Sequence, residues 1–208
     1  MHATFDPEQE RILIDIVRPM LEKGRKGDWD HTQRTIEYAR ILLREEPGEE
    51  NIVIPSLYLH DTGWGTIDYQ DFIDAPPAKK KETRSLWLHM EQGARIADRV
   101  LRDLHYDRDK RNRIVAIIAV HDDPDGILAL NDLSATLVME ADRLDRYGER
   151  SLKRYKDMFG PNYFKEAAWL EGIAMRREGL TEWFKTPTAK AMAHEMAVQI
   201  GVIEGGKQ

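Results

Sequence analysis

The sequence predicts an all-α fold of about eight or nine helices, because apolar residues recur at helical spacing in one segment after another. The period of about 3.6 residues is clearest in residues 83–105, where leucine, isoleucine, valine and alanine form one stripe. Glycine and proline separate the helical segments, as at Gly160 and Pro161. No segment of the sequence shows the alternation of apolar and polar residues that is typical of a strand.

The predicted helices begin at capping residues and end at glycine or proline. In chain order they cover residues 6–23, 28–45, 50–61, 83–105, 108–121, 135–147, 151–159, 162–178 and 188–200. Asp6, Asp107 and Ser134 are predicted N-caps. Either Asp28 or Asp30 is predicted to cap the second helix. Local sequence therefore defines most of the helix starts.

Residues 62–82 form the longest predicted break between helices. Gly63, Gly65 and Pro76 lie here among few aliphatic residues. A loop of this length in a compact domain usually has a function or lacks order, so we expect a lid or a substrate-binding loop. A second, shorter break is predicted at residues 122–126.

Composition argues against several classes of protein. The net charge of -6 provides no basic excess to neutralise phosphates, which argues against general nucleic-acid binding and against anionic membranes. No apolar run approaches the roughly 18 residues that a membrane span needs, and the first residues lack the pattern of a signal peptide. The chain has no cysteine, which excludes disulfides and thiolate metal sites and favours a reducing cytoplasm.

The pair His60-Asp61 is the centre of the sequence pattern, at the point where the third predicted helix gives way to glycines. Imidazole and carboxylate ligands together suit Mn, Fe, Ni, Mg or Zn. Further candidate ligands lie on either side of this pair, each in its own helical segment: His31, His89, His121 and Asp142. A helical bundle could point all of them at one cavity. The alternative is that they are ordinary capping and core polar residues.

The candidate ligands could hold one or two divalent ions per chain. One octahedral ion with open positions for water and substrate would use four of them: His31, His60, Asp61 and Asp142. The addition of His89 and His121 would allow two ions bridged by Asp61. Asp122 is expected to be a turn residue rather than a ligand.

Three motifs carry a resemblance to a known family: residues 28–34 around the first histidine, residues 59–63 around the His-Asp pair, and residues 140–148 around the last aspartate. Together they resemble the HD-domain metal-dependent phosphohydrolase superfamily, in particular its small bacterial subgroup, from about Trp29 to Gly148. The resemblance implies an HD-type helical bundle. It also implies that the four residues of the single-ion set bind metal, and that the two further histidines match the extra ones of dinuclear members.

The resemblance and the ligand set together predict one HD-type domain over residues 1–208, with a metal-site core at about 24–150 and a C-terminal helical extension at 151–208. One departure stands out: many members of the small subgroup carry His-Asp where this sequence has Gly27-Asp28. The extension at 151–208 contains no motif of the family.

A metal-dependent phosphohydrolase is the expected function, acting on a nucleotide or another small phosphate ester through a metal-activated water. An HD-fold di-iron oxygenase that oxidises a small phosphonate or polyol-like substrate is the first alternative, because it uses the same ligand types. A non-enzymatic nucleotide-binding regulator is the second. The expected partner is a small phosphate substrate, and the helices beyond residue 150 could form a homodimer face.

Catalytic roles are expected for Asp61, His89 and Arg34. His89 would be the general acid if it does not bind metal, and Arg34 lies on the same helix face as His31, one turn along. The candidates for substrate binding are Arg34, Trp64, Lys79, Lys80, Lys81, Arg84 and Arg143. Two alternatives stay open here, since the lysine run could be a solvated surface and Trp64 could pack in the core instead of stacking on a base.

Overall fold

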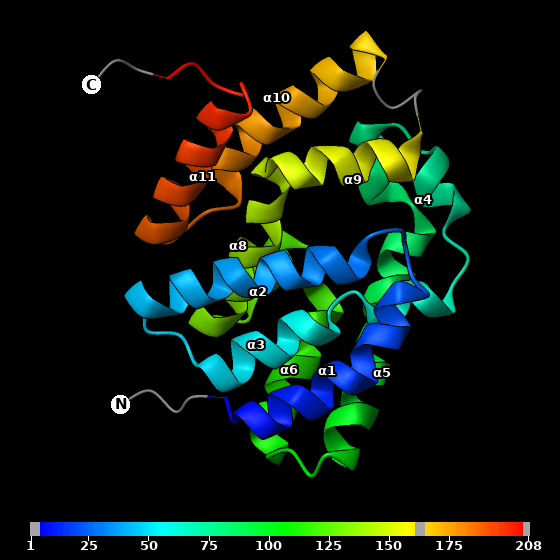
Figure 1. Ribbon diagram of the computed structural model, residues 1–208, viewed down its shortest axis with the longest axis vertical. Coiled ribbons are helices and arrows are strands. Elements are labelled where there is room, and N and C mark those ends of the chain that lie inside the picture. The colour runs from blue at the N-terminus through cyan, green and yellow to red at the C-terminus, as the bar shows by residue number, and fades with distance from the viewer. Residues whose placement is uncertain (1–4, 161–164, 206–208) are drawn as a thin grey trace.

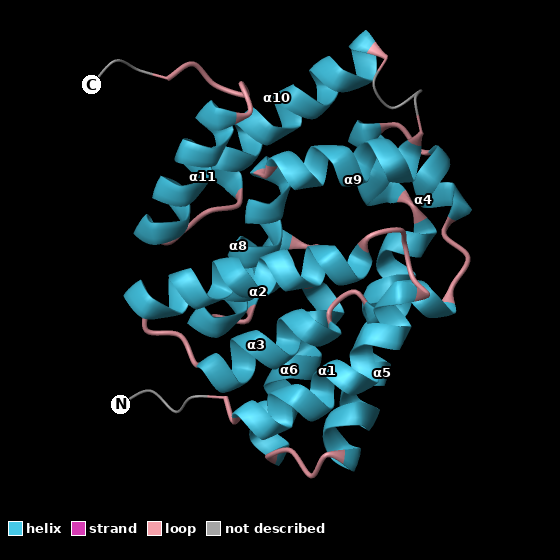
Figure 2. Ribbon diagram, in the orientation of Figure 1, coloured by secondary structure: helices cyan, strands magenta, loops and turns pink. Residues whose placement is uncertain are grey.

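The structure is a computed structural model that describes residues 5–160 and 165–205. Within these ranges it consists of α-helices and short 3₁₀ helices without any strand, which confirms the all-α prediction (Figure 2). In chain order the elements are α1 (Pro7–Glu22), α2 (Asp28–Glu45), α3 (Glu50–Leu59), η1 (Thr62–Thr66), α4 (Gln70–Asp74), η2 (Pro77–Glu82), α5 (Arg84–Asp103), α6 (Arg108–Val120), α7 (Pro124–Ala129), α8 (Leu133–Leu144), η3 (Asp145–Tyr147), α9 (Glu149–Phe159), α10 (Glu166–Glu182) and α11 (Pro187–Gln199).

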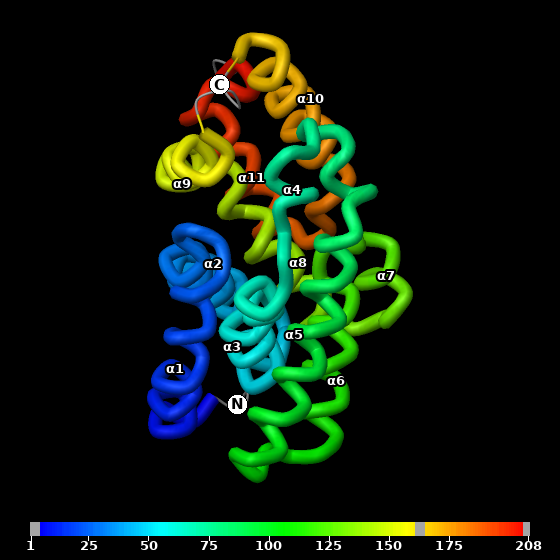
Figure 3. Tube along the Cα trace, turned by 90° about the vertical axis from the view of Figure 1, so that its right-hand side faces the viewer, coloured from blue at the N-terminus to red at the C-terminus, as the bar shows by residue number. Residues whose placement is uncertain are grey.

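The helices form an elongated bundle with two parts. Helices α1, α3, α5 and α6 fill the lower half of Figure 1, α2 crosses the middle, and α9, α10 and α11 stand above it. The turned view of Figure 3 shows the same order, with α8 leading from the lower bundle toward the upper helices. Helix α8 contacts both α2 and α3 on one side and α11 on the other. The upper helices are therefore joined to the lower bundle through α8, and also through contacts of α11 with α2 and of α10 with η2.

Helix α3 is the central element of the lower bundle. Every residue from Asn51 to Leu59 is buried, so this helix is enclosed on all sides, as expected of one that is apolar all round. Burial of each leucine or isoleucine side chain stabilises the fold by about 1.5 to 3 kcal/mol. The rigid end of α3 fixes the backbone of His60 and Asp61, which follow it directly.

Two of the predicted N-caps are confirmed. The carboxylate of Asp6 accepts a hydrogen bond from the backbone amide of Gln9 in α1. The carboxylate of Asp107 accepts from the backbone amides of Asp109 and Lys110 in α6. The prediction for Ser134 is wrong, because Asp132 caps α8 and accepts from the Ser134 amide at 2.8 Å. The hydroxyl of Ser134 instead accepts from the Glu49 amide at 3.0 Å, which joins α8 to the start of α3.

The predicted cap of α2 is also wrong. Gly27 occupies the N-cap position with φ 80°, a left-handed conformation that favours glycine, and no side chain caps this helix. Asp28 is fully buried, and its carboxylate accepts hydrogen bonds from the side chains of Arg25 and Arg154. Burial of a charge without such partners would cost several kcal/mol, so the two arginines explain its place.

The predicted loop at residues 62–82 is instead a series of short helical turns, η1, α4 and η2. Trp64 and Phe72 are buried here and form a small second core with Leu86. Gly63 is required by close packing, because a Cβ atom at this position would lie 2.0 Å from the backbone oxygen of His89. The prediction of a long loop is wrong because a few large aromatic residues hold this segment against α5, whereas its role as a lid or substrate-binding segment stays a prediction.

The remaining differences are at helix ends. The predicted break at residues 122–126 contains the start of α7 at Pro124. The predicted start of the helix at residue 162 lies outside the described residues, and α10 runs from Glu166 to Glu182. In the described part of the chain, no helix is both long and apolar enough to cross a membrane.

Candidate metal centre

The structure brings all six candidate ligands together at the centre of the bundle, although they come from five different segments. Helix α2 contributes His31, the end of α3 contributes His60 and Asp61, α5 contributes His89, α6 is followed by His121, and α8 contributes Asp142. All six side chains are buried. With Asp122 they form two clusters, and a third group of His60, Asp61 and His121 connects the two.

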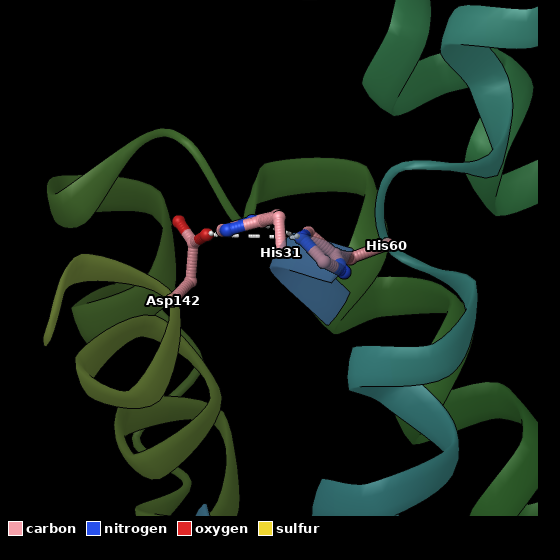
Figure 4. Close-up of side chains that lie close together, drawn as sticks. All are labelled: His31, His60 and Asp142. Carbon is pink, nitrogen blue, oxygen red and sulfur yellow. Dashed lines mark hydrogen bonds and ion pairs between the residues drawn. The ribbon is translucent and has the colours of Figure 1, made fainter. Parts of the chain in front are cut away.

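The first cluster consists of His31, His60 and Asp142 (Figure 4). The Nε2 atom of His31 lies 3.3 Å from Nε2 of His60 and 3.0 Å from Oδ1 of Asp142. Oδ2 of Asp61 lies 3.6 Å from Nε2 of His31 and 3.3 Å from Nε2 of His60. Two nitrogen and two carboxylate ligand groups therefore face one small volume.

The second cluster consists of His89, His121 and Asp122. The Nε2 atoms of the two histidines are 3.2 Å apart, and Oδ2 of Asp122 lies 3.6 and 3.9 Å from them. Oδ1 of Asp61 lies 3.8 Å from each of these nitrogens. Asp61 thus directs one oxygen to each cluster, the arrangement that a carboxylate bridging two ions requires.

Hydrogen bonds fix the ring orientation of three histidines. The Nδ1 atoms of His60 and His121 donate to the backbone oxygens of Leu57 and Ile118 at 2.7 and 2.8 Å. Nδ1 of His31 is 2.7 Å from Oδ2 of Asp145, a carboxylate that can only accept. Because Nδ1 is the donor in each ring, the neutral form directs the Nε2 lone pair into the clusters, as metal-ligating histidines do.

The electrostatics of both clusters fit a cation. Burial lowers the pKa of His60, but Asp61 and Asp142 outweigh burial and raise this pKa to about 9. Burial and the neighbouring His121 lower the pKa of His89 to about 3, which keeps its ring neutral. Against burial, Arg25 and His60 hold the pKa of Asp61 well below its usual range. Facing lone pairs beside ionised carboxylates are stabilised when positive charge lies between them, so the residues present fit a divalent metal.

Trp64 belongs to the support of the centre rather than to a substrate surface. Its side chain is 0% exposed, its ring stacks on His89 with centroids 4.0 Å apart, and Nε1 donates to Oδ1 of Asp61 at 2.9 Å. The hypothesis that Trp64 stacks on a base is therefore wrong, because no substrate can reach the ring. The packing alternative is the one that the structure supports.

A cavity of about 120 Å³ opens on the metal centre. His31, Asp61, His121 and Asp142 line its floor. Its walls carry several cations, contributed by both halves of the bundle: Arg25, Lys80, Lys81, Arg143, Arg146, Arg154 and Arg176. Aromatic and methionine side chains from α9 and α10 line the side that lies away from the lower bundle.

The predicted substrate-binding cations are distributed unevenly around this cavity. Lys81 and Arg143 line it, and Arg143 donates to Oδ1 of Asp122 at 2.8 Å. Lys80 lines it as well, but its Nζ donates to the backbone oxygens of Phe72 and Ala75, and burial lowers its pKa to about 8. These two hydrogen bonds link Lys80 in η2 to the backbone at the end of α4.

The other predicted cations lie outside the cavity lining. The residues concerned are Arg34, Lys79 and Arg84. Arg34 is buried and donates to both oxygens of Asp145, at 2.6 and 3.0 Å. Its role in phosphate binding stays a prediction, but its donors already have an acceptor. Asp145 in turn orients His31, so Arg34 contacts the centre through that carboxylate.

Several site residues were missed in the sequence. Asp122 was expected to be a turn residue, yet its carboxylate faces the second cluster. Asp145 follows Asp142 by three residues, a spacing that places both on one face of a helix and could have revealed it. Arg25 donates to Oδ2 of Asp61 at 2.5 Å and also to Asp28, so an unbroken chain of ion pairs connects Arg154, Asp28, Arg25 and Asp61.

Comparison with known proteins agrees with this geometry. The family model of the HD domain matches residues 28–147, more than half of the 208-residue chain. The chain belongs to the HD domain family. Every candidate ligand lies within the matched region, whereas α9, α10 and α11 lie beyond it.

Solved structures extend the likeness to the HD family fold as a whole. An HD superfamily hydrolase from an uncultured Thermotogales bacterium is 21% identical, with 92% of this chain and 86% of that chain covered at a TM-score of 0.60. An HD-superfamily hydrolase from Bacillus thuringiensis is 22% identical, with 93% of this chain and 94% of that chain covered at a TM-score of 0.56. A protein from Lactobacillus plantarum is 22% identical, with 95% of this chain and 94% of that chain covered at a TM-score of 0.57. At this identity the likeness establishes the fold. Among curated proteins, no match was found.

Proposed function

We propose that this HD-domain protein is a metal-dependent phosphohydrolase that acts on a nucleotide or another small phosphate ester. The observation that carries the proposal is the position of the cationic cavity, which opens directly on the paired His/Asp clusters. A dense group of arginines around a cavity favours a ligand with phosphate charge. The hydrolase names of two structural neighbours agree with this choice.

The metal would be held by the two clusters. A first ion would use His31, His60, Asp61 and Asp142, and a second would use His89 and His121 together with the other oxygen of Asp61. Mn, Fe, Ni, Mg and Zn all suit these ligands. When bound, such an ion supplies a Lewis acid for a phosphoryl oxygen and lowers the pKa of a coordinated water.

Side chains around the centre would bind phosphate, orient the shared carboxylate and act as ligands. Arg143 lies against the second cluster through Asp122 and can bind a phosphate oxygen near the ions. Arg25 lowers the pKa of Asp61 and, together with Trp64, orients its carboxylate, so it can serve both ligand clusters. His89 is fully buried and does not line the cavity, which favours a ligand role over the role of general acid.

Metal content and hydrolysis of phosphate esters, measured together, test this function. Asp61→Ala should lose both bound metal and turnover, because both clusters share its carboxylate. Asp15→Ala is the matched control, since Asp15 lies on α1 with 69% of its side chain exposed. If the Asp61 variant kept full metal content and full turnover, the site assignment would be wrong.

The di-iron oxygenase is a second candidate, because the two oxygens of Asp61 face two clusters that could each hold an ion. Two irons per chain, oxygen consumption and no hydrolysis of phosphate esters would favour it over the phosphohydrolase. The third hypothesis, a nucleotide-binding regulator, predicts tight binding of a nucleotide without turnover. A homodimer through the helices beyond residue 150 remains a proposal that measurement of the molar mass in solution would test.

A further inference from the structure

Arg146 occupies a distinctive place in the cavity wall. It lies in η3, directly after α8 and four residues beyond Asp142, and both side chains line the cavity. Its side chain is 28% exposed, compared with 3% for Arg143 and 8% for Arg154. Of these three arginines, Arg146 presents the most surface to a ligand.

Arg146 makes a longer contact with its carboxylate partner than Arg143 does. Oδ1 of Asp122 accepts from Arg143 at 2.8 Å and from Arg146 at 3.4 Å, so one carboxylate serves two guanidinium groups. The other oxygen of the same carboxylate faces His89 and His121. Asp142 adds a second negative charge near Arg146, but the long contact to Asp122 leaves the donors of Arg146 more available to an anionic ligand than those of Arg143.

The rigid surroundings of Arg146 prepare it for binding. The guanidinium carbons of Arg143 and Arg146 lie 5.3 and 5.0 Å from the centroid of the Trp183 ring. The backbone oxygen of Arg146 accepts from Nε of Arg176 at 2.8 Å. Trp183 is buried beside a turn whose amides donate to Glu140 on α8. Little conformational entropy remains to be lost when such a group binds an anion.

The cavity that Arg146 lines also has apolar side chains from α9 and α10. Met158 on α9 and Met175 on α10 line the same cavity as Arg146. These side chains give the cavity an apolar surface that can receive the organic part of a ligand.

We propose that Arg146, stacked with Arg143 on Trp183, is a specificity residue that binds a phosphate group of the substrate, while the apolar wall of α9 and α10 receives the organic group attached to it. The inference rests on the proposed phosphohydrolase function and narrows its substrate class. The substrate is a phosphate ester of an apolar or aromatic organic group, not an inorganic polyphosphate. The helices that would contact the organic group, α9 and α10, lie beyond residues 28–147, the part that matches the HD family model.

Adenosine triphosphate and inorganic tripolyphosphate are the matched pair of probes, because both carry the same phosphate chain and only one carries an organic group. Arg146→Gln should raise KM for both by about tenfold or more while kcat changes much less, the scale of one lost charged hydrogen bond. Arg146→Lys keeps the charge and should recover part of the loss. The control Arg150→Gln, on the exposed start of α9, should leave KM within about twofold of the wild type.

The apolar wall has its own pair of variants. Met175→Glu should raise KM for adenosine triphosphate by about tenfold and leave tripolyphosphate almost unchanged, because a carboxylate at this wall opposes burial of the organic group. Ala174→Glu on the exposed side of α10 is the control. Thermal unfolding of each variant separates a loss of folding from a loss of binding.

An unchanged KM in Arg146→Gln would overturn the role of Arg146. Equal kcat/KM for the two probes in the wild type would overturn the role of the apolar wall. If no phosphate ester is hydrolysed at all, the proposed function fails, and calorimetric binding of adenosine triphosphate to the metal-free protein decides the inference instead. A tenfold weaker Kd in Arg146→Gln would then support it, and an unchanged Kd would refute it.

Discussion

Asp145 connects the stability of the fold to the metal centre, and the substitution Asp145→Asn tests this connection. The carboxylate is buried, accepts from Nδ1 of His31 at 2.7 Å and accepts from Arg34 at 2.6 and 3.0 Å. Burial alone would raise the pKa of Asp145, but the hydrogen bonds and charges of His31 and Arg34 outweigh burial and lower this pKa to about 2. An asparagine of the same shape keeps the packing and removes the charge.

The magnitude of the effect follows from that pKa. A shift from an ordinary value of about 3.9 to about 2 corresponds to about 2.5 kcal/mol of stability above pH 4. Because the pKa is depressed in the folded state, the unfolded chain binds more protons between pH 4 and pH 2. Stability from Asp145 is therefore lost as pH falls through this window. The orientation of His31 is lost as well, and loss of such a partner typically weakens metal affinity by about 10- to 100-fold.

Urea unfolding of the metal-free protein at pH 7 and at pH 3, together with calorimetric metal binding at pH 7, measures both effects. The expected free-energy difference between Asp145→Asn and wild type is about 2 to 3 kcal/mol at pH 7 and smaller at pH 3. Asp15→Asn on the surface of α1 is the control. Equal stability at pH 7 together with unchanged metal affinity would refute the role of Asp145.

Three further substitutions or titrations test other parts of the structure. Gly63→Ala should destabilise the fold by at least about 3 kcal/mol in thermal unfolding, because its Cβ would meet the fixed backbone oxygen of His89; a Tm within a few degrees of wild type would contradict this. The pKa of His60, raised to about 9 mainly by Asp61 against burial, predicts that a divalent ion displaces about one proton at pH 7.5, measured by calorimetry in buffers of different ionisation enthalpy. Stability from this proton is lost as pH rises through 9, and metal binding without proton release would argue against it. Lys80→Met should lower stability by about 1 kcal/mol and leave KM for phosphate esters unchanged, since its ammonium already binds two backbone oxygens; a tenfold higher KM would restore it as a substrate residue.

The sequence allowed the fold class and the meeting of the six ligand candidates to be predicted, because both depend on spacing along helices. His60 and Asp61 end a helix that is apolar on every face, and this pattern can be recognised without coordinates. Whether the six residues bind metal stays a prediction that metal analysis will decide.

Contacts between distant residues could not be predicted in the same way. Arg154 and Asp28 are separated by 126 positions, and no local pattern pairs them. The segment at residues 62–82 was expected to be a loop because glycine, proline and polar residues dominate it. Two large aromatic side chains, Trp64 and Phe72, are sufficient to hold it against α5, and their effect depends on a partner surface that periodicity does not describe.

The chain of ion pairs from Arg154 through Asp28 and Arg25 to Asp61 has a consequence for any attempt to shorten this protein. A fragment that ended before α9 would keep every candidate ligand but would remove one of the two guanidinium groups that surround the buried carboxylate of Asp28. Arg25 would then be drawn more strongly to Asp28 and away from Asp61. The region that matches the HD family thus depends on its C-terminal neighbour for part of the charge balance around its buried carboxylates.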